Sequence, residues 1–205
     1  HFAGLTTLLQ RDQPLQYFAT PLVRASVTRK FCALLSIPES EFGRYFDIHD
    51  LEAGQWNDIM GLEVRPVISP HPVETTVFNF RVLWEGGYRT YSHLADIASF
   101  AVIDAMTTAD PSVPGLSPEH ARAIKASYLE PVDLKKIDIG GGMIHGCADD
   151  FAADDSTRLL LAHTARDLTH AERRIGSGAP FGTLDVMIPG QQNFLPREAS
   201  EFLRN

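Results

Sequence analysis

The chain has 205 residues, of which 44% are hydrophobic and 21% are charged. This length and composition are typical of one sizeable globular domain and exclude an intrinsically disordered chain. No apolar run approaches the roughly 20 residues that a membrane-spanning helix needs, so we expect no membrane association. Eighteen Lys and Arg against 26 Asp and Glu give a net charge of −8, which makes nucleic acid an unexpected partner. The two cysteines, Cys32 and Cys147, are too few for a disulfide framework, and we expect a cytoplasmic protein.

The first part of the chain predicts a helix, a strand and a second helix. Residues 5–9 carry leucines at helical spacing, and the apolar run 15–19 is typical of a strand. Thr20 and Pro21 form a helix start signal, because threonine can cap the first turn and proline fits its first position. We expect this second helix to end before Pro38.

Strand-like runs dominate the middle of the chain, after a stretch at 46–50 that we expect to be a loop. The runs comprise residues 62–68, 75–84 and 88–91. Gly86 and Gly87 separate the last two runs, and adjacent glycines suit a tight hairpin turn.

Helices and strands mix in the remainder of the chain. The expected helices are 97–106, 118–129 and 168–175, and the expected strands are 134–139 and 158–162. Because the two types mix without an internal repeat, we expect one α/β domain with a mixed sheet over residues 1–190. Residues 191–205 are expected to form a terminal helix or a linker to a further domain.

Residues of metal-ligand type follow three successive strand-like runs. His71 lies between two prolines that hold its backbone extended, Asp96 precedes a helical segment, and His163 follows an apolar strand. Together with His1 they form a set of four candidate ligands. Imidazole and carboxylate groups are the ligands that zinc prefers, and a carboxylate can bridge two such ions.

Each candidate also has a simpler interpretation. A single histidine after a strand is more often a surface or core residue, and Asp96 directly before a helix is by default an N-cap. Taken one at a time, these simpler interpretations are the better ones. The occurrence of three such residues after three successive strands favours a common site.

The opening residues 1–5, HFAGL, resemble the end of the His-x-His-x-Asp-His signature of the metallo-β-lactamase fold. The later motifs of that family follow in the same order along this chain. His71 matches its isolated histidine, Asp96 its bridging aspartate and His163 its final histidine. The resemblance implies an αββα sandwich, classed as α/β, of which this chain holds the C-terminal two-thirds with the N-terminal part missing. It also implies that the five preceding residues read His-x-His-x-Asp.

The same resemblance implies two divalent metal ions, with zinc foremost and manganese or iron as alternatives. In such enzymes one ion is held by two upstream histidines and the residue that matches His71. The second ion is held by the signature aspartate and the residues that match His1 and His163. The residue that matches Asp96 bridges the two ions.

The segment 137–146, IDIGGGMIHG, indicates a branch of this fold. His145 is similar to the extra histidine that ribonuclease Z and related phosphodiesterases carry before their last apolar strand. In that branch the histidine lies near the scissile phosphate, where it stabilises charge or protonates a leaving oxygen. The alternative is a tight glycine turn in which His145 has a structural role.

These features predict a dinuclear-metal hydrolase that cleaves a small phosphodiester, with His145 as a catalytic residue. The runs 71–75, HPVET, and 140–146, GGGMIHG, are similar to bacterial cyclic-nucleotide phosphodiesterases, which makes 3′,5′-cAMP or cGMP the leading substrate and implies a cyclic-nucleotide sensor domain in the full-length protein. We also expect a homo-oligomer. The net charge of −8 suits a small substrate better than RNA, which needs many cationic contacts. The alternatives are a thioester or lactone hydrolase, a ribonuclease Z-like nuclease, and an inactive binding or scaffold module.

Other charged residues are expected to be peripheral or to line the site. The acidic residues Asp149, Asp150, Asp154 and Asp155 are expected to be helix caps and a solvated face. Contacts with the substrate or its pocket are expected for Glu74, Arg166, Arg173 and Arg174. Surface or structural roles are expected for His49, His93, His120 and His170.

Overall fold

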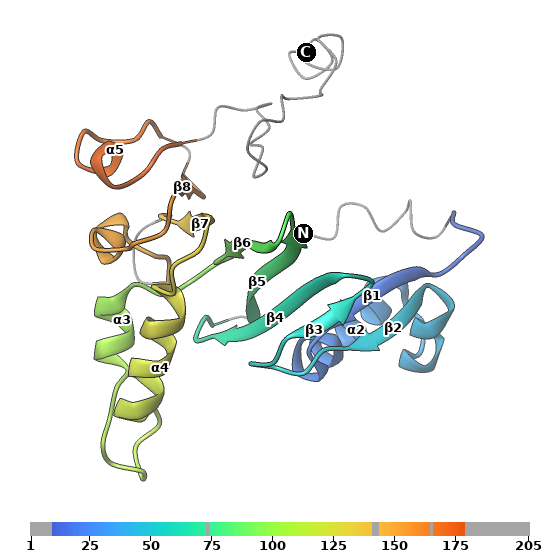
Figure 1. Ribbon diagram of the computed structural model, residues 1–205. Helices are drawn as coiled ribbons and strands as arrows, with labels where there is room; N and C mark the ends of the chain where they lie inside the picture. The colour runs from blue at the N-terminus through green and yellow to red at the C-terminus, as the bar shows by residue number, and fades with distance from the viewer. Residues whose placement is uncertain (1–9, 73, 141–143, 165, 179–205) are drawn as a thin grey trace.

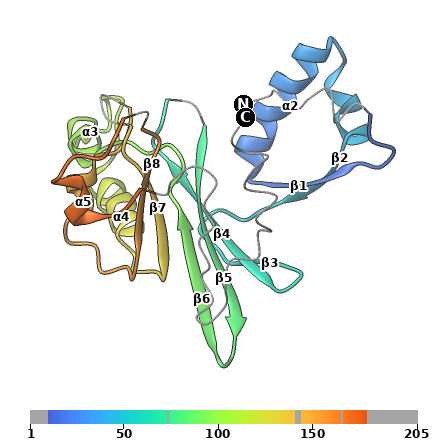
Figure 2. The same cartoon turned by 90° about the horizontal axis from the view of Figure 1, so that it is seen from above.

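The computed structural model describes residues 10–72, 74–140, 144–164 and 166–178. It contains a six-stranded sheet in the order β3-β4-β5-β6-β7-β8 and a separate two-stranded sheet, β1-β2. Helices α3, α4 and α5 lie to one side of the large sheet, and the unit of β1, α2 and β2 lies to the other (Figures 1 and 2). The predicted α/β class with a mixed sheet is confirmed. Within the described ranges, no helix has both the length and the apolar character that crossing a membrane requires.

The first unit consists of β1 (Leu15–Ala19), α2 (Pro21–Leu35), the 3₁₀ helix η1 (Glu39–Arg44) and β2 (Phe46–Asp50). Strands β1 and β2 are parallel, and α2 connects them as a crossover. The expectation of a loop at 46–50 is wrong, because the backbone of this polar segment pairs with β1 along its whole length. The helix at 5–9 was expected in a part of the chain that lies outside the described residues.

The six strands of the large sheet are β3 (Asn57–Ile59), β4 (Leu62–Ser69), β5 (Thr75–Trp84), β6 (Gly87–His93), β7 (Leu134–Asp138) and β8 (Leu159–Ala162). Strands β3 to β6 pair as antiparallel neighbours, whereas β6, β7 and β8 are parallel. The parallel part requires crossovers, and the helices supply them. The carboxyl ends of β6, β7 and β8 therefore meet at one edge of the sheet.

The hairpin between β5 and β6 is present, one residue earlier than its glycines predict. Trp84 pairs with Gly87, so the two central residues of the turn are Glu85 and Gly86. Both have left-handed backbone angles, with φ of 46° and 82°. This conformation matches the right-handed twist of the strands on either side.

The helices near the large sheet are shorter than their sequence patterns predict. Helix α3 spans Phe100–Ala105, α4 spans Pro118–Tyr128 and α5 spans Glu172–Ile175, while the 3₁₀ helix η2 spans Ala148–Phe151. Helix α3 begins late because the Ser99 hydroxyl accepts a hydrogen bond from the third residue of the helix and so caps it.

Two hydrophobic clusters stabilise the fold. The larger lies between the sheet and helices α3 and α4, and it includes the fully buried Val77, Leu94, Ile103, Tyr128 and Ile137. The smaller belongs to the first unit and joins α2, η1 and β2 through the buried Phe31, Cys32, Phe42 and Phe46. Edge-to-face contacts between aromatic rings strengthen the smaller cluster.

A buried ion pair joins β7 to the segment before β8. The Lys135 ammonium group donates a hydrogen bond to the Asp154 carboxylate, and both side chains are 0% exposed. Burial lowers the pKa of Lys135, and the Asp154 charge opposes that effect. The expectation that Asp154 belongs to a solvated acidic face is therefore wrong. Asp150, in contrast, accepts a hydrogen bond from the Phe100 backbone N–H at the start of α3, as the expected helix cap.

Substitution of one partner of this pair should be costly. Asp154→Asn leaves the Lys135 charge buried without compensation, so we expect the free energy of unfolding to fall by about 3–5 kcal/mol in urea titrations. The double variant Lys135→Met with Asp154→Leu should recover most of that loss. As a control, Asp104→Asn breaks the exposed pair with Lys125 and should cost less than about 1 kcal/mol. A cost for Asp154→Asn no larger than that of the control would contradict this account.

Candidate metal centre

Four side chains of metal-ligand type converge where the carboxyl ends of the parallel strands meet. Asp96 follows β6, Asp138 is the last residue of β7, and His163 directly follows β8. His145 comes from the segment between β7 and η2. One potential ligand atom from each residue lies within 4.8 Å of those of the other three.

The carboxylate of Asp138 is the centre of this arrangement. It is 1% exposed, and each of its oxygens contacts one imidazole and one backbone N–H. Oδ1 accepts hydrogen bonds from the Gly140 N–H at 2.8 Å and from Nδ1 of His163 at 3.0 Å. Oδ2 accepts from the Ile97 N–H at 3.3 Å and from Nδ1 of His145 at 2.9 Å.

These four contacts occupy the lone pairs of Asp138. A carboxylate has about four acceptor positions, and here backbone amides and imidazoles use them. We therefore interpret Asp138 as the residue that orients the two histidines, with little capacity left to bind an ion. Because each histidine donates through Nδ1, its Nε2 atom is left as an acceptor for a ligand or an ion.

Backbone conformation also marks this site. His163 has φ of 63°, and Ala95, directly before Asp96, has φ of 49°. Such left-handed angles are unfavourable for residues with a side chain, and at functional sites they are held by the surrounding structure. At Met60 and Glu85 the same angle is explained by a tight hairpin turn. At the candidate centre it occurs at His163 and directly before Asp96, two members of the cluster.

The structure brings three of the predicted site residues together. Asp96, His145 and His163 lie in one cluster, with Oδ1 of Asp96 3.5 Å from Nδ1 of His163. His71 is adjacent to the cluster, since its ring centroid is 5.9 Å from that of His145. His1 lies outside the described residues.

The simpler interpretation of Asp96 does not hold. The N-cap of α3 is Ser99, so Asp96 is not required to start the helix. The Asp96 side chain is partly exposed, so its carboxylate is accessible to an ion.

Sequence reasoning missed Asp138. The residue ends a strand-like run and precedes a glycine segment, so the rule that identified Asp96 and His163 also applied to it. Its partners could not be read from the sequence. The contact with His163 arises only when β7 and β8 lie side by side, and the contact with His145 depends on the fold of the segment after β7.

The donor set fits a divalent cation. The Nε2 atoms of His145 and His163 and the carboxylate of Asp96 remain as donors, because both Nδ1 atoms contact Asp138. Imidazole and carboxylate are suitable ligands for zinc, manganese and iron.

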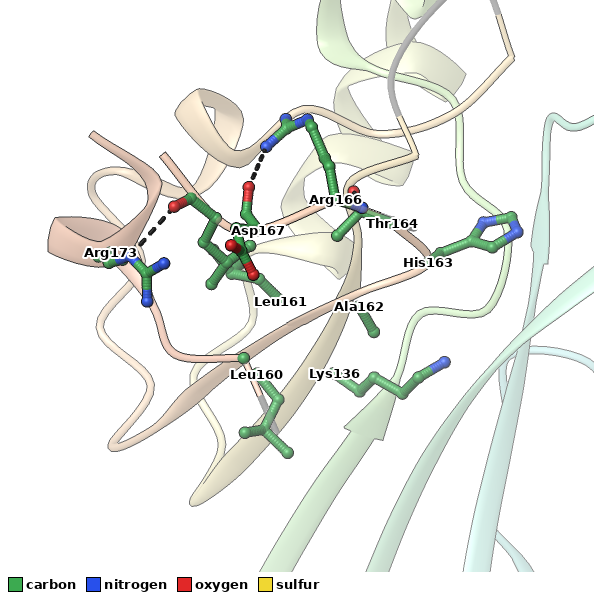
Figure 3. A pocket seen from close by; sticks show the side chains of 11 residues that line it. Lys136, Leu160, Leu161, Ala162, His163, Thr164, Arg166, Asp167 and Arg173 are labelled. Atoms are coloured by element: carbon green, nitrogen blue, oxygen red, sulfur yellow. Dashed lines mark hydrogen bonds between the residues drawn. The ribbon is translucent and has the colours of Figure 1, made fainter. Parts of the chain in front are cut away.

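A hollow of about 560 Å³ opens beside His163, and its wall contains three cationic residues and the acidic Asp167 (Figure 3). Lys136, Arg166 and Arg173 line it, and the Lys136 and His163 side chains extend in the same direction in Figure 3. The Arg166 guanidinium is already paired with Glu172 and holds the pKa of that carboxyl at about 2. Lys136 and Arg173 are therefore the better candidates for contact with an anion.

Two residues expected near the substrate lie elsewhere. The Glu74 carboxylate accepts a hydrogen bond from Ser26 at 3.0 Å and lies 3.9 Å from Lys30, so it is directed toward α2. Arg174 is outside the lining of the cationic hollow, although its neighbour Arg173 belongs to it.

His93 lies close to the candidate centre and has a structural environment. Burial lowers the pKa of its imidazole, the nearby Lys136 charge lowers it further, and Asp96 partly opposes these effects. The Tyr91 hydroxyl is 3.0 Å from Nδ1 of His93. A neutral imidazole at neutral pH agrees with the structural role that the sequence predicts.

Removal of the Asp138 charge tests its orienting role. We expect Asp138→Asn to weaken zinc binding by about 10- to 100-fold in calorimetric titrations, because an amide cannot accept both Nδ1–H groups. Asp133→Asn serves as a control. Asp133 directly precedes β7, at the end of the strand opposite Asp138, and accepts hydrogen bonds from Thr90. Equal zinc affinity of the two variants, with thermal unfolding curves that show both are folded, would contradict the role of Asp138.

Comparisons with known proteins place the chain by its fold. No protein-family model and no curated protein sequence matches it. The metallo-β-lactamase fold protein YhfI from Bacillus subtilis matches with a TM-score of 0.53 and 12% identity, over 87% of this chain and 68% of that one. A protein named as a zinc-dependent hydrolase candidate of the metallo-β-lactamase superfamily, from Thermotoga maritima, matches with a TM-score of 0.36 and 16% identity, over 62% and 55%. The short form of human tRNase Z matches with a TM-score of 0.44 and 14% identity, over 85% and 67%. The chain therefore has the metallo-β-lactamase fold that it shares with YhfI.

Proposed function

We propose that this protein is a dinuclear-metal hydrolase of small phosphodiesters. The observation that carries the proposal is the convergence of Asp96, His145 and His163 around the buried Asp138 carboxylate. The metallo-β-lactamase fold supports the proposal, because the resemblance to that family implies an enzyme with two divalent metal ions. In this proposal Asp96 and His163, with His71 and His1, would hold the ions.

Bound divalent ions would supply two effects here: a water pKa lowered toward about 7, and polarisation of the phosphoryl oxygen. The chain's own residues then determine the geometry. Asp138 fixes His163 in one orientation, so the imidazole keeps Nε2 directed away from the buried carboxylate. Asp96, which follows the left-handed residue Ala95, would supply a carboxylate ligand for the ions.

His145 is the proposed proton donor. Its Nδ1–H group donates to Asp138, which leaves Nε2 to carry a second proton at the mouth of the site. The buried carboxylate holds the imidazole in this orientation, as an acidic partner does in other catalytic pairs. A proton on Nε2 can pass to the leaving alkoxide oxygen when the phosphorus–oxygen bond breaks.

The charge distribution favours a small substrate. The chain carries a net charge of −8, and among the described residues Lys136, Arg166 and Arg173 line a hollow of about 560 Å³ beside the site. A protein that follows a long RNA backbone needs many cationic contacts along its surface. We propose a 3′,5′-cyclic nucleotide as the substrate, because its single phosphodiester requires few such contacts.

The His145→Ala variant tests the proton donor. We expect its kcat for bis(p-nitrophenyl) phosphate to fall only modestly and its kcat for an alkyl phosphodiester to fall by about 10²–10⁴-fold, because only the alkoxide needs a proton to leave. Hydrolysis of a simple carboxylic ester should be nearly unchanged. His120→Ala, at an exposed position on α4, serves as the control. An equal loss for all substrates, or none, would contradict the role of His145.

Metal content separates an enzyme from a scaffold. We expect Asp96→Ala to lower the zinc retained after purification, measured by elemental analysis, because the variant removes the partly exposed carboxylate of the cluster. Asp149→Ala removes an exposed carboxylate at η2 and should leave the zinc content unchanged. Unchanged zinc in the Asp96 variant would favour the binding or scaffold alternative.

A further inference from the structure

The candidate centre has a second hollow beside it, with a different chemistry. Three histidines form a row, in which the ring centroid of His145 lies 5.9 Å from that of His71 and 4.6 Å from that of His163. The cationic hollow borders the row at His163. The second hollow, of about 350 Å³, borders it at His71.

The lining of this second hollow is apolar. Besides His71 it consists of Pro70, Pro72, Ala98, Val102, Met106 and Ile144. None of these described residues carries a full charge, whereas the hollow at the other end of the row has three cationic residues in its wall.

The walls of the apolar hollow are held in place. Two prolines restrict the backbone on both sides of His71. The opposite wall belongs to α3, whose start is fixed by the Ser99 cap and by the Asp150 carboxylate that accepts the Phe100 N–H at 2.8 Å. A preformed apolar hollow with a few polar groups at its mouth is typical of a small-molecule site.

We propose that the apolar hollow beside His71 holds an aromatic or other apolar group of the substrate. This inference rests on the proposed phosphodiesterase function and specifies its substrate class. Met106 and Ile144 are 36% and 41% exposed, so a ring seated between them removes their apolar surface from water. The substrate's phosphate then lies along the histidine row, and its more polar part extends toward Lys136.

The opposite orientation is disfavoured by desolvation. An apolar ring in the cationic hollow would have to displace water from Lys136 and Arg173 without replacing the lost hydrogen bonds. A polar or anionic group in that hollow can instead pair with the same side chains. The two hollows therefore distinguish the apolar part of the substrate from its polar part.

Binding of two phosphonates to the zinc-loaded protein tests this assignment. Phenylphosphonate and methylphosphonate share the anionic group and differ in the substituent, so calorimetry should show about tenfold tighter binding of the phenyl compound. Met106→Gln and Ile144→Gln should each reduce that ratio severalfold, because each places an amide in the wall. Met60→Gln, at a position 86% exposed in the β3–β4 turn, should leave it unchanged.

The outcomes separate this inference from the function on which it rests. Equal affinity for both phosphonates, or a ratio that neither wall variant changes, would overturn the assignment of the hollow. The proposed function would stand in that case if methyl p-nitrophenyl phosphate is still hydrolysed with zinc. If phosphonates fail to bind and no diester is cleaved, both the function and the inference are overturned.

Discussion

The site depends on one buried carboxylate. Asp138 lies at the end of β7 with almost no exposure, and it contacts histidines from the segments that follow β7 and β8. A carboxylate in this position would be unfavourable without compensating hydrogen bonds. The backbone amides of Gly140 and Ile97 provide two of them. Because the remaining two come from imidazoles, the requirement to satisfy one buried group determines the orientation of both histidines.

The sheet makes that arrangement possible. Strands β6, β7 and β8 are parallel neighbours, so residues distant in the sequence leave the sheet at the same edge. The left-handed backbone at Ala95 and His163 then turns the chain sharply at two of the three strand ends. Packing of the large cluster against α3 and α4 offsets the cost of these conformations. The left-handed conformations at Ala95 and His163 thus depend on the packing of the large hydrophobic cluster.

The sequence predicted much of this architecture and part of the site. Strands with strong apolar patterns and the helix that begins at Pro21 were identified, and the strand-end rule placed Asp96 and His163 together, because these features depend on local chemistry. The expected side-chain cap at Thr20 was wrong, because the Thr20 hydroxyl makes no capping hydrogen bond. Strand β2 was missed because its polar residues become a strand only by pairing with β1. Asp154 was assigned to the surface because acidic residues are usually exposed, and its buried partner is 19 positions away. Asp138 was missed for the same reason, since its role is defined by contacts across the sheet.

The two buried charges on β7 restrict how this strand can change over evolution. Lys135 points into the helical side of the sheet and pairs with Asp154, whereas Asp138 orients the histidines. Replacement of Lys135 or Asp154 alone passes through a state with an unpaired buried charge, so a neutral path requires two nearly simultaneous substitutions. Replacement of Asp138 releases two imidazoles at once. Sequence variation in homologous chains should therefore be accepted more readily in the walls of the two hollows, where substrate preference can diverge while the strand beneath them stays the same.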